Sequence, residues 1–159
     1  MRKSIIAILM TFCLSIMTYA QTPRDRATEL KEQAQSSLNQ KDYIKARYLF
    51  KKAYEAFATR ENYPQAIECG VQANALYVRE NFYKEGFELC RDMDQLIWAG
   101  EQNQKKVFYD LRFLVNKERL QMYTALKNPA QAKTQLNKLE ETANLAKNDS
   151  LTEVLLYTK

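Results

Sequence analysis

One spacing pattern recurs three times along this chain of 159 residues and restricts what it can fold into. In each copy, a polar turn leads to a small residue, then to an apolar residue four positions on and to another three positions beyond that. The three copies are Ala46, Phe50 and Ala53; Gly86, Cys90 and Met93; and Ala132, Leu136 and Leu139. Steps of four and three keep side chains on one face of an α-helix. Because the small residue lets a neighbouring backbone come close, the pattern predicts tightly paired helices.

A second amphipathic segment precedes each copy, so the unit is a helix, a short turn and a helix. Its apolar or small residues are Ala27, Leu30, Ala34 and Leu38; Ala66, Gly70, Ala73 and Tyr77; and Phe113, Leu120, Tyr123 and Leu126. The chain has only 3 Gly and 3 Pro, which leaves little material for β-turns or long loops. We therefore predict an all-α protein made of stacked antiparallel helix pairs.

This unit resembles the tetratricopeptide repeat, a helix pair of about 34 residues. The first unit carries the likeness best, through Leu30, Ala34, Ala46, Phe50 and Ala53, whereas Ser37 replaces a usual aromatic residue and Asn74 a usual small one. The resemblance implies a right-handed α-solenoid over residues 24–159. Its units would span about 24–60, 61–100 and 101–147, with an incomplete fourth at 148–159.

Several residues mark where these helices begin and end. Asp42 is placed to cap the helix that follows it, and Pro64 and Pro129 suit a first helical turn. Gly100 is a natural stop for a helix that ends near Trp98. These signals divide the chain at the same places as the repeat.

The last residues contain the start of one more helix. Ser150 and Glu153 form a capping box, and an apolar run follows up to Tyr157. A helix of about ten residues is not stable alone in water, and a solenoid needs a polar outer face on its terminal helix. We expect the sequence to be the N-terminal piece of a longer protein; the alternative is a natural end in a short docked helix.

The first twenty residues read as a secretory signal peptide. Arg2 and Lys3 give a positive start, an apolar run extends from Ile5 to Met17, and Ala20 offers a cleavage site before Gln21. The apolar run is short for a membrane span. Export predicts an oxidising compartment, most simply a bacterial periplasm.

The charge of the chain argues against nucleic acid as a partner. The formal net charge is +5, but removing Arg2 and Lys3 from the 24 basic residues leaves 22 against 19 acidic ones, without a basic stripe. Direct membrane binding by the mature part is not expected either. Its most apolar stretch, Val107 to Val115, is interrupted by Asp110 and Arg112, and it predicts a helix buried between neighbours on two sides.

The residues needed for common enzyme chemistry are missing from the sequence. The chain has no histidine, and Gly70, Gly86 and Gly100 are isolated rather than gathered in a phosphate-binding loop. We predict no catalytic residue, no cofactor and no metal site. Cys69 and Cys90 fall in consecutive helices. They would either form a disulfide or remain separate and act as small buried apolar residues.

The resemblance implies where a partner would bind. In this family the first helix of each pair lines a concave groove that holds a peptide or a partner helix. The groove positions here are Lys31, Gln35, Asn39, Val71, Ala75, Arg79, Lys117, Gln121 and Thr124. Of the residues with which some members clamp a terminal carboxylate, only Lys31 and Lys117 fit.

Two functional hypotheses follow from this organisation. An export signal, helical repeats and an unfinished last helix resemble the periplasmic repeat region of bacterial membrane sensor histidine kinases. That likeness implies a sensory or scaffold module with a tether to the inner membrane, a kinase and a dimer interface all lying downstream of these residues. The alternative is a free periplasmic scaffold or assembly factor without a signalling domain.

Overall fold

The computed structural model describes residues 23–146, and in this range the chain forms six α-helices and no β-strand. The helices are α2 (Pro23–Asn39), α3 (Tyr43–Ala58), α4 (Tyr63–Arg79), α5 (Tyr83–Gln104), α6 (Tyr109–Ala125) and α7 (Pro129–Ala146). The prediction of an all-α protein is confirmed. The signal segment 1–20 and the helix expected from Ser150 lie outside the described residues.

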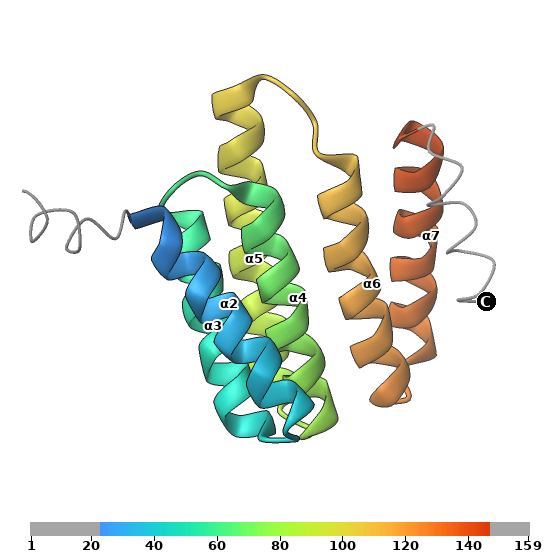
Figure 1. Ribbon diagram of the computed structural model, residues 1–159. Helices are drawn as coiled ribbons and strands as arrows, with labels where there is room; N and C mark the ends of the chain where they lie inside the picture. Colours follow the sequence, from blue (N-terminus) through green and yellow to red (C-terminus); the bar gives the residue numbers. More distant parts are fainter. Residues whose placement is uncertain (1–22, 147–159) are drawn as a thin grey trace, which may run out of the picture.

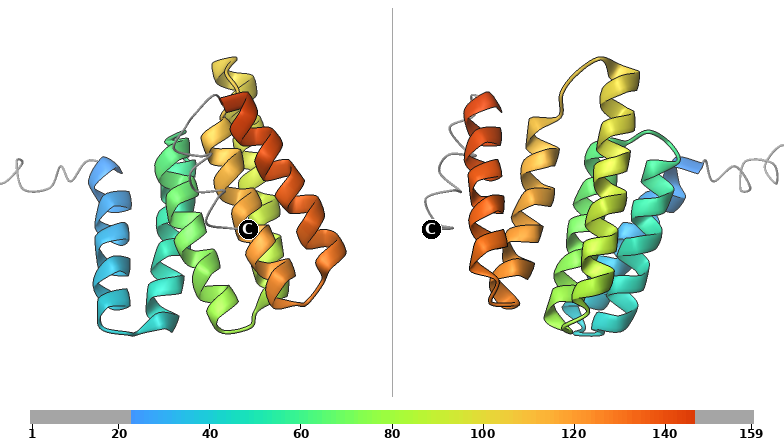
Figure 2. Two further views of the ribbon diagram at one scale, coloured as in Figure 1. Left: turned by 90° about the vertical axis from the view of Figure 1, so that its right-hand side faces the viewer. Right: turned by 180° about the vertical axis from the view of Figure 1, so that it is seen from behind.

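Each helix packs against the next one along the chain, and α4 also packs against α6. Figure 1 shows the helices running alternately up and down across the molecule. Figures 1 and 2 show that within each pair the second helix lies behind the first: α3 behind α2, α5 behind α4 and α7 behind α6. The helices therefore alternate between a front and a back layer in staggered pairs, and α6 lies between α5 and α7.

Four of the five connections share one backbone pattern. Each has the same pair of backbone hydrogen bonds at a residue with positive φ, and these residues are Lys41, Glu61, Asn81 and Lys127. The fifth connection also has a residue with positive φ, Lys105. In the first turn, the Lys41 N–H donates to the Leu38 carbonyl at 2.9 Å and the Asp42 N–H donates to the Ser37 carbonyl at 2.9 Å. These two bonds form a Schellman motif, which satisfies the last carbonyls of a helix and reverses the chain.

Side-chain caps complete three of these turns. The Asp42 side chain accepts from the Lys45 N–H at 3.2 Å, and Asn62 and Asn128 cap the starts of α4 and α7 in the same way. Pro64 lies in the first turn of α4 and Pro129 begins α7. The predicted helix starts are confirmed.

The predicted helix end at Gly100 is wrong. Helix α5 continues through Gly100 to Gln104, and Lys105 ends it in the left-handed conformation with φ 51°. Gly100 is buried, and a Cβ atom there would lie 2.8 Å from the Phe108 ring and 2.9 Å from the Tyr63 ring. The glycine therefore serves a close approach of two aromatic rings to the backbone of α5.

Helix α6 is buried on two faces. One face, with Leu111, Val115 and Met122, joins the main core that extends from α2 to α6. The other face, with Phe113 and Leu120, packs in a second cluster against Leu139 and Ala143 of α7. The expected burial between two neighbours is confirmed for α6, which begins at Tyr109 and leaves Val107 outside the helix and exposed.

Candidate functional site

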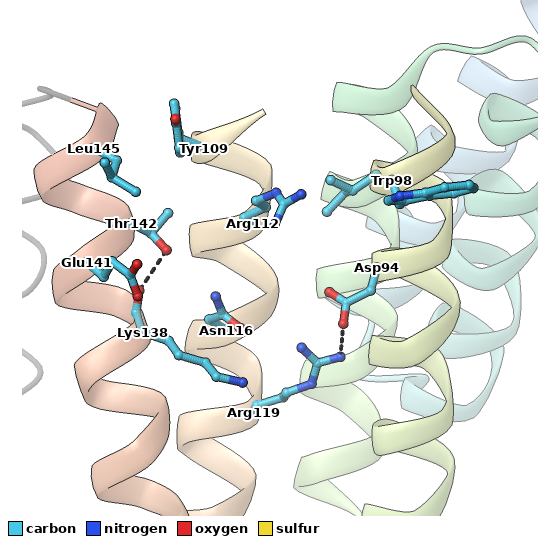
Figure 3. Close-up of a pocket in the computed structure, with 11 residues that line it drawn as sticks. Asp94, Trp98, Tyr109, Arg112, Asn116, Arg119, Lys138, Glu141, Thr142 and Leu145 are labelled. Carbon is cyan, nitrogen blue, oxygen red and sulfur yellow. Dashed lines mark hydrogen bonds and ion pairs between the residues drawn. The ribbon is translucent and has the colours of Figure 1, made fainter. Parts of the chain in front are cut away.

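A pocket with a volume of about 460 Å³ lies between α5, α6 and α7. It forms because α5 and α7 each pack against α6 but are not in extensive contact with each other. Figure 3 shows the side chains that line it, which are Asp94, Ile97, Trp98, Tyr109, Arg112, Asn116, Arg119, Lys138, Glu141, Thr142 and Leu145. Polar and charged groups predominate among them, with apolar side chains at the edge.

Arg112 is fixed at one end of the pocket by a buried carboxylate. Its Nε donates to Glu101 Oε1 at 2.7 Å, and its Nη2 pairs with Oε2 of the same carboxylate. The backbone N–H of Phe108 donates to Glu101 at 2.9 Å as well. The Arg112 hydrogen bond, with help from Phe108, lowers the pKa of Glu101 although burial opposes this. Glu101 thus remains ionised and holds the start of α6 against α5.

Arg119 crosses from α6 to α5 at the other end. Its Nη2 donates to the Cys90 carbonyl at 3.1 Å and pairs with the Asp94 carboxylate. The side chain is 17% exposed, whereas Asp94 is 48% exposed. Arg119 is therefore a positioned cation in the floor of the pocket.

Lys138 of α7 brings a third cation to the pocket. Figure 3 shows its side chain extending from α7 toward Arg119 of α6, and Asn116 lies on the same helix as Arg119. Within residues 23–146, Lys138 has no carboxylate within ion-pair distance. An approaching anion would therefore meet an ammonium group that is not held in an ion pair, next to an amide and a fixed guanidinium group, although the carboxylates of Asp94 and Glu141 line the same pocket.

The edge of the pocket carries large apolar groups that face solvent. Trp98 of α5 is 62% exposed and Leu145 of α7 is 54% exposed, while Ile97 in the same lining is buried. Trp98 is the one tryptophan of the whole sequence. Exposed tryptophan and arginine side chains are enriched among the residues that dominate binding energy at protein interfaces.

The nine residues predicted to line a groove come from α2, α4 and α6, and none of them lines the α5–α6–α7 pocket. None is buried. Lys31 Nζ donates to Gln65 at 2.8 Å and to Glu68 at 2.7 Å, and so links α2 to α4. Gln35 donates to Asn39 at 3.2 Å. The Arg79 guanidinium lies 4.1 Å from the centroid of the Tyr43 ring.

The other groove residues are less engaged. Val71 belongs to the edge of the main core, and Ala75, Lys117 and Gln121 lie on α4 and α6. Thr124 donates to the Leu120 carbonyl at 2.8 Å and lines a separate hollow at the α6–α7 turn. The structure thus places the predicted residues in one layer, but it engages several of them in internal contacts.

Sequence reasoning missed the pocket because its residues come from two different helix pairs. Trp98 and Arg119 are far apart in the chain, and no motif links them. A usable signal was the position of Trp98, which departs from the buried face of α5 defined by Leu89, Met93 and Ile97.

Cys69 and Cys90 are both buried and free, with no disulfide between them. Burial raises the pKa of each thiol to about 12. For Cys90 the charge of Arg119 acts in the opposite direction and is weaker. Both side chains therefore behave as small apolar residues of the core.

No group of His, Cys, Asp and Glu side chains in the described part of the chain is arranged to hold a metal ion. Between residues 23 and 146, no helix combines the length and apolar character needed to span a membrane.

Comparison with known proteins adds no assignment. No protein-family model matches the chain, and neither curated proteins nor solved structures show a significant match to it.

Proposed function

We propose that this chain is a protein–protein interaction module built as a right-handed solenoid of tetratricopeptide-like helix pairs. Three observations support the repeat. The helices alternate between two layers, four connections share one turn, and the first helices of the second and third pairs, α4 and α6, pack together. A stack of helix pairs exposes long surfaces between helices, which is how such proteins bind partners.

The partner contact is the α5–α6–α7 pocket, which binds an acidic peptide segment that carries an apolar or aromatic side chain. The observation that carries this proposal is that the exposed Trp98 and Leu145 line the same pocket as Lys138 and Arg119. Acidic groups of the peptide would accept charge-assisted hydrogen bonds from Lys138. The apolar side chain would pack on Trp98 and leave water.

The cellular setting of this module rests on residues 1–20 and on the arrangement of the repeats. The signal segment favours an exported, periplasmic module, either as the sensory or scaffold part of a longer membrane signalling protein or as a free scaffold. The full open reading frame separates these two, since the first requires a hydrophobic span of about 20 residues downstream.

The emission of Trp98 tests the pocket directly, because no other tryptophan contributes to it. The probe is the peptide acetyl-Glu-Asp-Phe-Asp-Glu-amide, with a comparison peptide in which lysines replace the four acidic residues. We expect a saturable blue shift with the acidic peptide alone. Lys138→Ala should weaken binding about tenfold, the effect of losing one hydrogen bond between charged groups.

Two controls make the result specific. Lys133→Ala removes the same charge from an exposed position of α7 outside the pocket and should leave the affinity unchanged. The double variant Lys31→Ala and Lys117→Ala tests the groove predicted from the sequence. Loss of binding in that double variant, with none in Lys138→Ala, would move the site to the groove and reject the pocket.

A further inference from the structure

A buried polar pair connects α4 with α6 inside the main core. Asn74 of α4 is 0% exposed and Glu118 of α6 is 4% exposed. Asn74 Nδ2 donates to Glu118 Oε2 at 2.9 Å, across 44 positions of sequence. Asn74 stands where the repeat usually has a small residue, so the pair is a departure from a purely apolar contact between these two helices.

The pair is incomplete when Glu118 is ionised, because Asn74 Oδ1 is buried without a hydrogen-bond donor. A buried acceptor without a partner is costly and rare in folded proteins. The groups near Asn74 Oδ1 around Gly86 do not supply a hydrogen-bond donor. The Gly86 N–H already donates to the Phe82 carbonyl at 3.0 Å, and Met122 offers only a thioether sulfur against Gly86.

We propose that the folded protein holds Glu118 as a neutral carboxylic acid whose O–H donates to Asn74 Oδ1 while its carbonyl oxygen accepts from Asn74 Nδ2. An amide and a carboxylic acid are complementary in this way, since each presents one donor beside one acceptor. Protonation satisfies both groups at once and removes a charge from the core. Ionisation of Glu118 then weakens the packing of α6 on α4.

The surroundings of Glu118 favour the neutral form. Burial raises its pKa, and the weaker effects of the Asn74 hydrogen bond and of the Lys117 charge oppose this. From α5, the Cys90 thiol faces Glu118 and remains neutral, because its own pKa is raised to about 12.

The nearby charges on the packed helices are engaged elsewhere. Arg119 pairs with Asp94 of α5, and on α4 Glu68 pairs with Lys31 while Arg79 lies over the Tyr43 ring. From α7, Lys138 extends into the pocket. No cation within the described helices makes an ion pair with Glu118.

The sign of the pH effect follows from this arrangement. A carboxyl whose pKa is higher in the folded than in the unfolded state binds its proton more readily when folded. Its contribution to stability is therefore complete below the ordinary glutamate value and is lost as pH rises through the folded-state pKa. Because α6 also carries Arg112, Asn116 and Arg119, the pH-sensitive contact and the proposed peptide pocket share one helix.

Thermal unfolding of the whole chain tests the proposal, with measurements from about pH 4.5, just above the ordinary glutamate pKa, to about pH 8. Glu118→Gln keeps the shape and supplies a permanent N–H donor to Asn74 Oδ1. We expect it to raise the midpoint at pH 8 by about 3–5 °C for each tenfold gain in folding equilibrium, with little change at pH 4.5. Glu88→Gln, the same change at an exposed position of α5, should follow the wild type throughout.

Two results would reject the proposal. One is a Glu118→Gln variant that is less stable than the wild type at every pH, or whose unfolding midpoint differs from that of the wild type by the same amount at every pH. The other comes from the unmodified protein labelled with ¹³C at glutamate side chains. NMR should find one carboxyl that titrates well above the ordinary range and is missing from Glu118→Gln; ordinary titration of every glutamate would reject the proposal even if the variant did not fold.

Discussion

The Glu101 carboxylate near the end of α5 accepts hydrogen bonds from two nitrogen atoms of Arg112 on α6. The same carboxylate also accepts a hydrogen bond from the backbone N–H of Phe108, in the connection between α5 and α6. The connection from Lys105 to Phe108 is the one that lacks the turn shared by the other four. Glu101 therefore replaces a regular turn as the element that sets α6 against α5, and with it one wall of the pocket.

Removing Arg112 should destabilise the fold by about 1–3 kcal/mol at neutral pH, because Glu101 would remain buried without its strongest partner. Solvent screening reduces this expected loss of stability, since the Arg112 side chain is 46% exposed. The pKa of Glu101 is lowered in the folded state, so this stabilisation is present above the ordinary glutamate pKa and is lost as pH falls through the folded value. Denaturant unfolding of Arg112→Ala should thus approach the wild type in acid.

Arg91→Ala provides the matched control for that experiment. The Arg91 side chain is 67% exposed, and its Nε lies 4.0 Å from Asp92 Oδ1. An exposed pair of this kind is expected to contribute less than about 1 kcal/mol. An equal loss of stability in both variants at neutral pH would contradict the assigned role of Glu101.

Gly100→Ala should destabilise the protein more than Gly70→Ala. A methyl group at Gly100 meets the Phe108 and Tyr63 rings at 2.8 and 2.9 Å, and rigid rings, of which Tyr63 is buried in the core, yield less readily than a flexible side chain. Overpacking of this kind costs about 1–3 kcal/mol, against a gain of about 1 kcal/mol in helix propensity. At Gly70 the nearest atom is the flexible Met93 sulfur, at 2.5 Å. Urea unfolding of the two variants gives the order, and the reverse order would show that the rings move freely.

Lys41→Gly and Glu61→Gly should each stabilise the protein. Both residues are exposed and have positive φ, at 61° for Lys41 and 57° for Glu61. A side chain in this conformation costs about 1–2 kcal/mol, whereas glycine adopts it freely. Part of the gain is lost to the greater freedom of glycine in the unfolded chain, which leaves about 0.5–1 kcal/mol.

A glycine in the middle of a helix provides the control for these turn variants. Lys51→Gly in α3 should destabilise the protein by about 1 kcal/mol, because glycine has a low helix propensity. Chemical denaturation measures all three variants. A loss of stability in either turn variant would exclude the left-handed conformation there.

Cys69 and Cys90 should resist alkylation while the protein is folded. Burial keeps both thiols protonated at neutral pH, and the thiolate is the reactive form. Peptide mapping after treatment with iodoacetamide should find both unmodified in buffer and both modified in denaturant. Rapid labelling of the folded protein, or recovery of a peptide that joins the two cysteines after mild oxidation, would contradict the buried, separate thiols.

The sequence determined the helices and most of their ends. Spacings of four and three at Ala46, Phe50 and Ala53 define a helical face without reference to the rest of the chain, and Asp42 caps α3 through a backbone N–H only three positions away. Such features are local, so the all-α fold and the helix starts could be predicted. The same reasoning went wrong at Gly100, where the local meaning of glycine as a helix stop was overridden by two aromatic rings from other parts of the chain.

Tertiary structure decided the pocket and the buried pair. Trp98, Arg119 and Lys138 share a site because α5 and α7 both pack on α6 and leave space between them, and Asn74 reaches Glu118 because α4 and α6 lie side by side. These contacts join residues that are far apart in the chain. Their formation depends on how whole helices pack, and no short stretch of sequence encodes that geometry.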